Sequence, residues 1–188
     1  TQHPLASRLP PDAVMALSGR STNAQNSFVP TLLETYLTLL GDRIPDPSAA
    51  RTELQALLGH IGTEWAAGVA RPANEAPETT FLIALADGGA SARESLTRLS
   101  RAVWLKNTKL GTQSLELSFR NNVLLLRLKA PPATARPGGN AATPTVEAPL
   151  KTPTELAIAV VGDTLAFVLG SKVQTSLSAL QARQSGPQ

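Results

Sequence analysis

The pattern of apolar and polar positions is clearest in the last third of the chain. Residues 156–160 and 165–169 are two short apolar runs, and the pair Gly162-Asp163 separates them. A Gly-Asp pair between two such runs is typical of a tight hairpin turn. Because the runs are apolar at every position, they indicate strands that are covered on both faces. We therefore expect a central strand pair, followed by a helix over residues 171–180 that Ser171 caps.

Similar patterns earlier in the chain predict an alternation of strands and helices. Apolar runs predict strands at residues 13–17 (short and buried), 65–70, 79–86, 112–119 and 123–129, and helical spacing predicts helices at residues 23–40, 48–58 and 91–105. Residues 65–70 fit a helix or a strand by period, and the poor helix formers Gly68 and Val69 favour the strand. Ser91 and Glu94 match a capping box at the start of the third helix. The order predicts an α+β fold with a mostly antiparallel sheet and about four helices packed on it.

The length and the local composition predict one domain over residues 9–184, since 188 residues fit a single core. Residues 130–152 are rich in Pro, Ala, Gly and Thr and contain no aromatic residue. Such a segment cannot bury enough apolar surface to offset its ordering entropy. We expect a long flexible insertion there, and loose termini at residues 1–8 and 185–188.

The overall composition excludes several classes of protein. The chain has no cysteine, so disulfides and thiolate zinc sites are excluded. The formal net charge of +3 is small for a protein that binds nucleic acid by electrostatic attraction alone. No run of 18 apolar residues occurs, so we expect no transmembrane segment. The core is expected to be aliphatic, because aromatic residues make up only 4% of the chain.

Four short motifs in order resemble an uncharacterised bacterial cell-envelope family, a domain of unknown function. They are Leu9-Pro10-Pro11-Asp12 at the first strand, Gly62-Thr63-Glu64 in mid-chain, a strand that ends at Asp87, and Gly162-Asp163-Thr164-Leu165 in the closing hairpin. Each motif is short, and the insertion at 130–152 departs from the family pattern. The resemblance implies an exported, periplasmic or envelope-associated protein without catalytic residues.

The candidate chemistry of the sequence is sparse. The two histidines, His3 and His60, are far apart, and one lies in the expected loose arm, so they make a poor metal site. With His60 as the only plausible base, the sequence predicts no Ser-His-Asp arrangement. Ser171 and Lys172 could bind an anion at a helix start, although a simple N-cap is the plainer interpretation. The chain is therefore predicted not to be an enzyme, with no cofactor and no metal.

Three functions remain as hypotheses. The first is a non-catalytic envelope domain that acts by contact with a protein or an envelope component. The second is a carrier or sensor of a hydrophobic ligand, such as an acyl chain of a lipid, in a groove between the sheet and the helices of residues 27–58. The third is weak binding of nucleic acid or of an anionic surface through basic residues of the 93–109 region. The small net charge makes nucleic acid the less expected of these partners. The alternative is that these residues form a solvated helix face without a partner. These residues are Arg93, Arg98, Arg101, Lys106 and Lys109.

Overall fold

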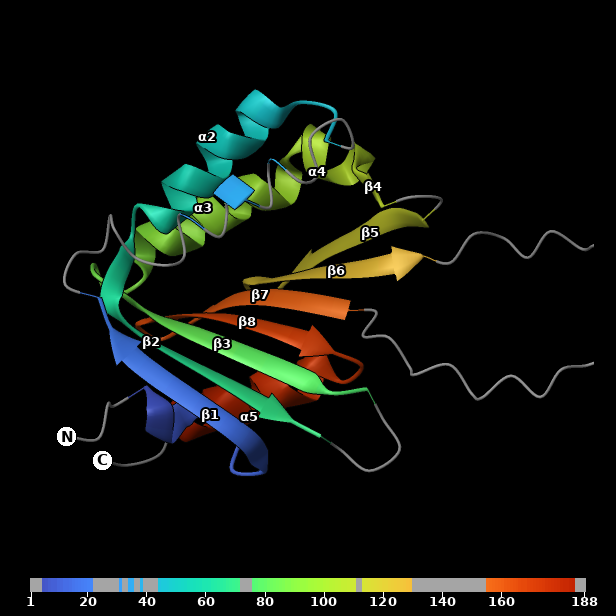
Figure 1. The fold of residues 1–188 in the computed structure, drawn as a ribbon. Helices are drawn as coiled ribbons and strands as arrows, with labels where there is room; N and C mark the ends of the chain where they lie inside the picture. The colour runs from blue at the N-terminus through green and yellow to red at the C-terminus, as the bar shows by residue number, and fades with distance from the viewer. Residues whose placement is uncertain are drawn as a thin grey trace, which may run out of the picture.

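The computed structural model describes residues 5–21, 31, 34–35, 38, 44–71, 76–110, 113–129 and 155–184. These residues form one antiparallel sheet with helices on both sides (Figure 1). The strands are β1 (Ala13–Arg20), β2 (Ile61–Ala70), β3 (Glu78–Leu85), β4 (Lys109–Leu110), β5 (Gln113–Arg120), β6 (Val123–Lys129), β7 (Glu155–Val161) and β8 (Thr164–Gly170). The helices are the short 3₁₀ helix η1 (Ala6–Arg8) and the α-helices α2 (Pro47–Leu58), α3 (Ala90–Arg101), α4 (Val103–Asn107) and α5 (Val173–Gln184). The predicted α+β class with a mostly antiparallel sheet is confirmed.

The closing hairpin is the centre of the sheet, as its apolar runs predict. The strand order is β1-β2-β3-β8-β7-β6-β5-β4, so β8 and β7 have three or four strands on either side. Phe167 of β8 lies opposite Phe81 of β3 and Ile158 of β7. The turn between the two strands contains Gly162 at φ 57°, a left-handed backbone conformation that glycine adopts without a Cβ clash.

One side of the sheet, here called the helix side, packs against α3 and α4, and α2 packs on those two helices (Figure 1). Leu96 and Leu99 of α3 are fully buried, as is Leu57 of α2. The sheet residues beneath these helices lie at one end of the central strands. They are Ile83 and Leu85 of β3, Leu124 of β6, Ile158 and Val160 of β7, and Leu165 of β8.

The opposite side of the sheet, here called the α5 side, carries small residues under α5. Three buried alanines of the central strands β7 and β8 face this helix: Ala157, Ala159 and Ala166. Because these side chains are short, the backbone of α5 can approach the sheet closely. Leu177 and Leu180 of α5 are buried there, together with Leu5 and Leu9 on either side of η1.

The prediction that residues 13–17 form a buried strand is wrong about burial. These residues do form a strand, but β1 lies at the edge of the sheet and pairs only with β2 among the described strands. Val14, Met15 and Leu17 are 72%, 54% and 57% exposed. A short apolar run is equally compatible with a central strand and with an exposed edge, so the pattern alone does not distinguish them.

Two local predictions around α3 are also wrong. Residues 91–105 form two helices, because Ala102 has an extended conformation (φ −61°, ψ 124°) between α3 and α4. The capping box at Ser91 and Glu94 does not form, because α3 begins one residue earlier, at Ala90. The carboxylate of Asp87 takes the capping role and accepts hydrogen bonds from the N–H groups of Gly89 at 3.0 Å and Ser91 at 3.3 Å.

The prediction of a loose arm at residues 1–8 is wrong for residues 5–8. Leu5 is 3% exposed, and the Arg8 guanidinium contacts Asp163 in the β7–β8 turn at 2.7 Å. The predictions for residues 1–4, 130–152 and 185–188 lie outside the described residues, as does most of the helix expected at 23–40. Residues 31, 34, 35 and 38 of that segment are helical.

Candidate functional site

The helices cover only part of the helix side of the sheet. Beyond α3 and α4 the same side continues over the other end of the central strands and onto β1. The strand register places Leu17, Ala67, Phe81, Phe167 and Ile158 in one row across five strands. Of these, Ile158 is buried by the helices, Phe81 and Phe167 are half-buried, and Leu17 is exposed.

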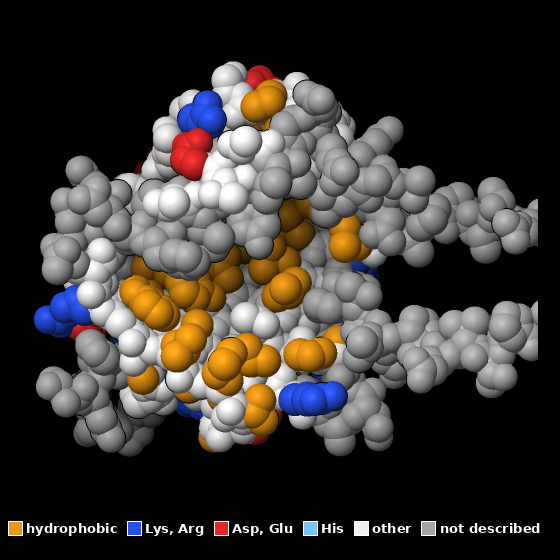
Figure 2. All heavy atoms as spheres, in the orientation of Figure 1, with side chains coloured by type: hydrophobic (Ala, Val, Ile, Leu, Met, Phe, Trp, Pro, Cys, Tyr) orange, Lys and Arg blue, Asp and Glu red, His pale blue; other side chains and the backbone are white. Residues whose placement is uncertain are grey.

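The incompletely covered residues form what we call the open apolar face. It comprises Met15, Leu17, Trp65, Phe81, Leu156, Phe167 and Leu169. Leu169 is 39% exposed, and the aromatic members and Leu156 are half-buried. Figure 2 shows this side of the molecule, with apolar side chains gathered in the hollow below the helix layer. A contiguous apolar patch of this kind marks an interaction site more often than scattered apolar residues do.

Aromatic rings form the middle of the open apolar face. The ring centres of Trp65 and Phe81 are 6.1 Å apart, and those of Phe81 and Phe167 are 6.4 Å apart. These tilted contacts link three neighbouring strands and fix the rings in place. Gly19 makes room for Trp65 at the edge, since a Cβ atom on Gly19 would lie 2.8 Å from the indole ring.

The backbone beneath the open apolar face is already hydrogen-bonded. Strands β2, β3, β8 and β7 each have a strand on both sides, so their N–H and C=O groups pair within the sheet. A ligand on this face therefore meets apolar side chains and few free donors or acceptors. The apolar side chains that the structure describes on this face suit contact with a hydrocarbon ligand.

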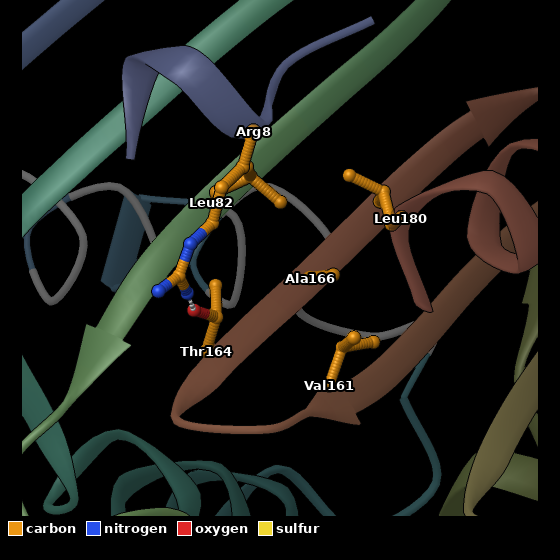
Figure 3. Close-up of a pocket in the computed structure, with 6 residues that line it drawn as sticks. All are labelled: Arg8, Leu82, Val161, Thr164, Ala166 and Leu180. Atoms are coloured by element: carbon orange, nitrogen blue, oxygen red, sulfur yellow. Dashed lines mark hydrogen bonds between the residues drawn. The ribbon is translucent and has the colours of Figure 1, made fainter. Parts of the chain in front are cut away.

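The described cavities on the α5 side are less suited to a ligand. Figure 3 shows one of about 10 Å³ between Arg8, Leu82, Thr164 and Leu180, where Arg8 donates to the Thr164 hydroxyl at 2.6 Å. That volume holds about one water molecule. The hydrogen bond from Arg8 also holds the pKa of Asp163 below its ordinary value, despite some opposing burial.

A larger cavity of about 210 Å³ lies between α5 and the ends of β2 and β3. The Glu78 carboxylate at its wall is 8% exposed and accepts a hydrogen bond from the Ser176 hydroxyl. Lys172, one of the two residues predicted to hold an anion at the helix start, also lines this cavity. Ser171 and Lys172 are both exposed. The lining contains two acidic residues, Asp12 and Glu78, and two basic residues, Lys172 and Arg183, so the cavity favours neither sign of charge.

The structure brings together a serine, a histidine and an aspartate in the arrangement of a catalytic triad, which the sequence did not predict. They are Ser95, His60 and Asp87. The Ser95 hydroxyl lies 3.4 Å from His60 Nε2, and His60 Nδ1 lies 3.8 Å from an Asp87 carboxylate oxygen. The second distance is too long for a hydrogen bond. Ser95 is 2% exposed within α3, where neighbouring N–H groups bond inside the helix and cannot form an oxyanion hole.

These groups instead connect α3 to the turns beside it. Arg98 donates to the Ser95 hydroxyl at 3.2 Å. The hydrogen bond from the Ser91 side chain, with smaller effects of the N–H groups and of His60, holds the pKa of Asp87 below its ordinary value. Among the residues described, no three His, Asp or Glu side chains lie close enough to hold a metal ion.

The structure places the predicted basic residues on three different elements, α3, α4 and β4. Arg93 donates to the carbonyl of Gly162 at 2.9 Å and so holds α3 to the β7–β8 turn. Arg98 and Arg101 are exposed on α3, whereas Lys106 lies on α4, beyond the break at Ala102. The Lys109 side chain lies outside what the structure describes.

The residues of the open apolar face were not predicted; the sequence hypothesis placed an apolar groove between the sheet and the helices of residues 27–58. The members of the open apolar face lie on five strands, and only the strand order brings them together. None of the helices in the described part of the chain has the length and apolar character needed to span a bilayer. Comparison of the chain with protein-family models, curated proteins and solved structures finds no match.

Proposed function

We propose that this protein is a non-catalytic binding domain whose open apolar face holds an acyl chain. The observation that carries the proposal is the row of half-buried aromatic and aliphatic side chains over strands whose backbone is already paired. Apolar pockets with few polar groups are typical of sites for hydrophobic ligands. The sequence hypothesis of an apolar groove between the sheet and the helices of residues 27–58 proposes the same class of ligand.

An acyl chain fits the face better than an extended peptide does. A peptide laid on β3 and β8 would leave its own amides without partners, since the sheet beneath offers no free backbone groups. An unpaired buried amide costs about 1–3 kcal/mol. A hydrocarbon chain has no such groups, so the whole contact contributes favourably. An amphipathic helix, whose amides pair internally, is the competing occupant.

The expected affinity follows from the number of buried methylenes. Each buried CH₂ contributes about 0.8 kcal/mol, so about ten of them contribute about 8 kcal/mol. Lost translational and rotational freedom offsets at least about 4 kcal/mol of this, while contacts with the rings of Phe81 and Phe167 add to it. The dissociation constant for a long-chain fatty acid is therefore expected at about 0.1–1 mM.

The test uses Trp65 as a reporter within the face. Trp104, the other tryptophan, is 7% exposed and donates to Glu53 at 2.9 Å, away from the site. In a Trp104→Phe background the emission comes from Trp65 alone. Titration with dodecanoate and hexadecanoate should shift this emission to the blue, and the longer chain should bind more tightly.

Three serine variants locate the site. Leu17→Ser and Leu169→Ser remove exposed apolar side chains from the helix side of the sheet and should each weaken binding several-fold. Val103→Ser removes a similarly exposed side chain from α4, outside the open apolar face, and should leave binding unchanged. Equal weakening by Val103→Ser and Leu17→Ser, or no response of Trp65 to either fatty acid, would refute the proposal. Binding of an amphipathic peptide without fatty-acid binding would also refute it, in favour of the competing occupant.

The envelope location and the family resemblance are separate predictions. Fractionation of the native host cell, with the protein detected by antibody, tests the location. Lipid found in native mass spectrometry after gentle purification would support the function without identifying the compartment.

A further inference from the structure

The outer edge of β1 has the properties of a strand that pairs with another chain. Among the described strands it has β2 as its only neighbour, and Figure 1 shows it at the margin of the sheet. Natural edge strands are usually protected by Pro, Lys, inward-pointing charges, β-bulges or very short length. The eight residues of β1 (AVMALSGR) have one such device, a bulge near Val14, and a single charge at the end, Arg20; residues 16–19, beyond the bulge, carry none of them.

The register shows which backbone groups point outward from this edge. The N–H of Ser21 donates to the carbonyl of Thr63 at 2.7 Å, so these two opposite residues form a hydrogen-bonded pair. Such pairs alternate with non-bonded pairs in an antiparallel ladder. Gly19 and Leu17 therefore bond toward β2, and the N–H and C=O groups of Ala16 and Ser18 project from the open edge.

The charges at the two ends of β1 are complementary to a second copy in the antiparallel direction. Asp12 precedes the strand, Arg20 ends it, and Ala16 is midway between them. Antiparallel pairing about Ala16 brings Asp12 of each copy toward Arg20 of the other. Parallel pairing would instead bring like charges together. The Arg20 side chain is 65% exposed and long enough to contact a carboxylate while it also contacts Glu64.

The same pairing covers the exposed apolar side chains of the edge. With the two-fold axis at Ala16, Met15 of one copy lies opposite Leu17 of the other, both on the helix side. These side chains are 54% and 57% exposed in the single chain. Ala16 lies at the axis, where a small side chain lets the two strands approach without a clash.

We propose that two copies of this chain associate by antiparallel pairing of their β1 strands, which joins two sheets edge to edge. The interface is smaller than that of obligate dimers, so the dissociation constant is expected at about 10–100 µM. This inference does not depend on the proposed acyl-chain site.

The first measurement is sedimentation velocity of the wild type. The concentrations range over about 5–500 µM and so bracket the expected dissociation constant. A rise in the weight-average sedimentation coefficient toward that of a dimer is expected. A monomer at every concentration overturns the proposal and leaves a strand of a different protein as the occupant of the edge. Ala16→Pro removes an outward N–H that β2 does not use, and should abolish the association. Ala16→Ser keeps both the N–H and a small side chain, so it is the matched control, which should still associate.

Charge exchange tests the direction and register without removing backbone groups. Asp12→Arg gives two positive ends and Arg20→Asp gives two negative ends, so each variant alone should lose at least about tenfold in affinity, the range of a close charge pair. An equal mixture of the two should associate again, because each Arg then lies opposite an Asp. Association of either variant alone at wild-type strength, or no recovery in the mixture, overturns the proposed pairing. Circular dichroism confirms that each variant is folded.

Discussion

Gly88 and Gly89 precede α3, and replacing each with alanine tests whether a close contact with the β7–β8 turn positions this helix over the sheet. Both have positive φ, at 70° and 92°. A Cβ atom at Gly88 would have no neighbour within 4 Å, whereas a Cβ at Gly89 would lie 2.7 Å from the carbonyl oxygen of Gly162 and 2.9 Å from Val160 Cγ1. The two substitutions to alanine therefore share the backbone strain and differ in the contact with the β7–β8 turn.

The magnitudes follow from that difference. An alanine in a left-handed conformation costs about 1–2 kcal/mol, which is the whole effect expected for Gly88→Ala. Gly89→Ala adds an overpacked contact that costs about 1–3 kcal/mol. The free energy of unfolding should therefore fall by about 2–5 kcal/mol for Gly89→Ala, a large part of the 5–15 kcal/mol that is typical of a domain.

Urea unfolding followed by tryptophan fluorescence measures both effects. At an m-value of about 2 kcal/mol/M, the midpoint for Gly89→Ala should lie about 0.5–1.5 M below that for Gly88→Ala. The m-values should agree, since neither change alters how much surface unfolding exposes. Equal midpoints for the two variants would show that the start of α3 does not press against the β7–β8 turn.

Two further outcomes are expected. Because Arg8 holds the pKa of Asp163 below its ordinary value, the ion pair stabilises the fold above about pH 4, and this contribution is lost as the pH falls through the lowered pKa. Asp163→Asn should therefore be less stable than the wild type at pH 7, by less than about 1 kcal/mol for so exposed a pair, and the two should converge near pH 2 in thermal unfolding. Gly170→Ala would place a Cβ 2.9 Å from Cγ of the buried Glu78, so it should destabilise by about 1–3 kcal/mol in the same urea assay. An unchanged midpoint would mean that Glu78 moves aside at little cost.

The sequence pattern predicted the central hairpin because its signals were local and mutually consistent. Two apolar runs that flank Gly162-Asp163 predict an antiparallel hairpin with a tight turn, and β7 and β8 form this hairpin. The Asn121-Asn122 turn is similar, since both residues have positive φ (51° and 61°) that asparagine tolerates. Here the local preference and the tertiary structure require the same conformation.

The remaining features depend on contacts that are distant in sequence. Ala102 breaks the helix although it is a good helix former, because Trp104 and Leu105 of α4 must also reach the core. His60 and Ser95 meet across 35 residues through the packing of α3. The open apolar face needs the strand order as well as the position of the helices, and neither is encoded in any single stretch of the chain.

The two proposals meet geometrically at β1 but remain separable. Pairing of two β1 strands about an axis perpendicular to the sheet places both helix sides on the same side of the joined sheet. Met15 and Leu17 of the two copies then connect the two open apolar faces. A ligand that extends across this junction would bind the dimer more tightly and, by reciprocity, would strengthen dimerisation. A ligand confined to β2, β3, β8 and β7 of one copy would bind Ala16→Pro as tightly as the wild type, because that variant keeps every side chain of the face. Acyl-chain binding can therefore fail while pairing persists, and pairing can fail while binding persists.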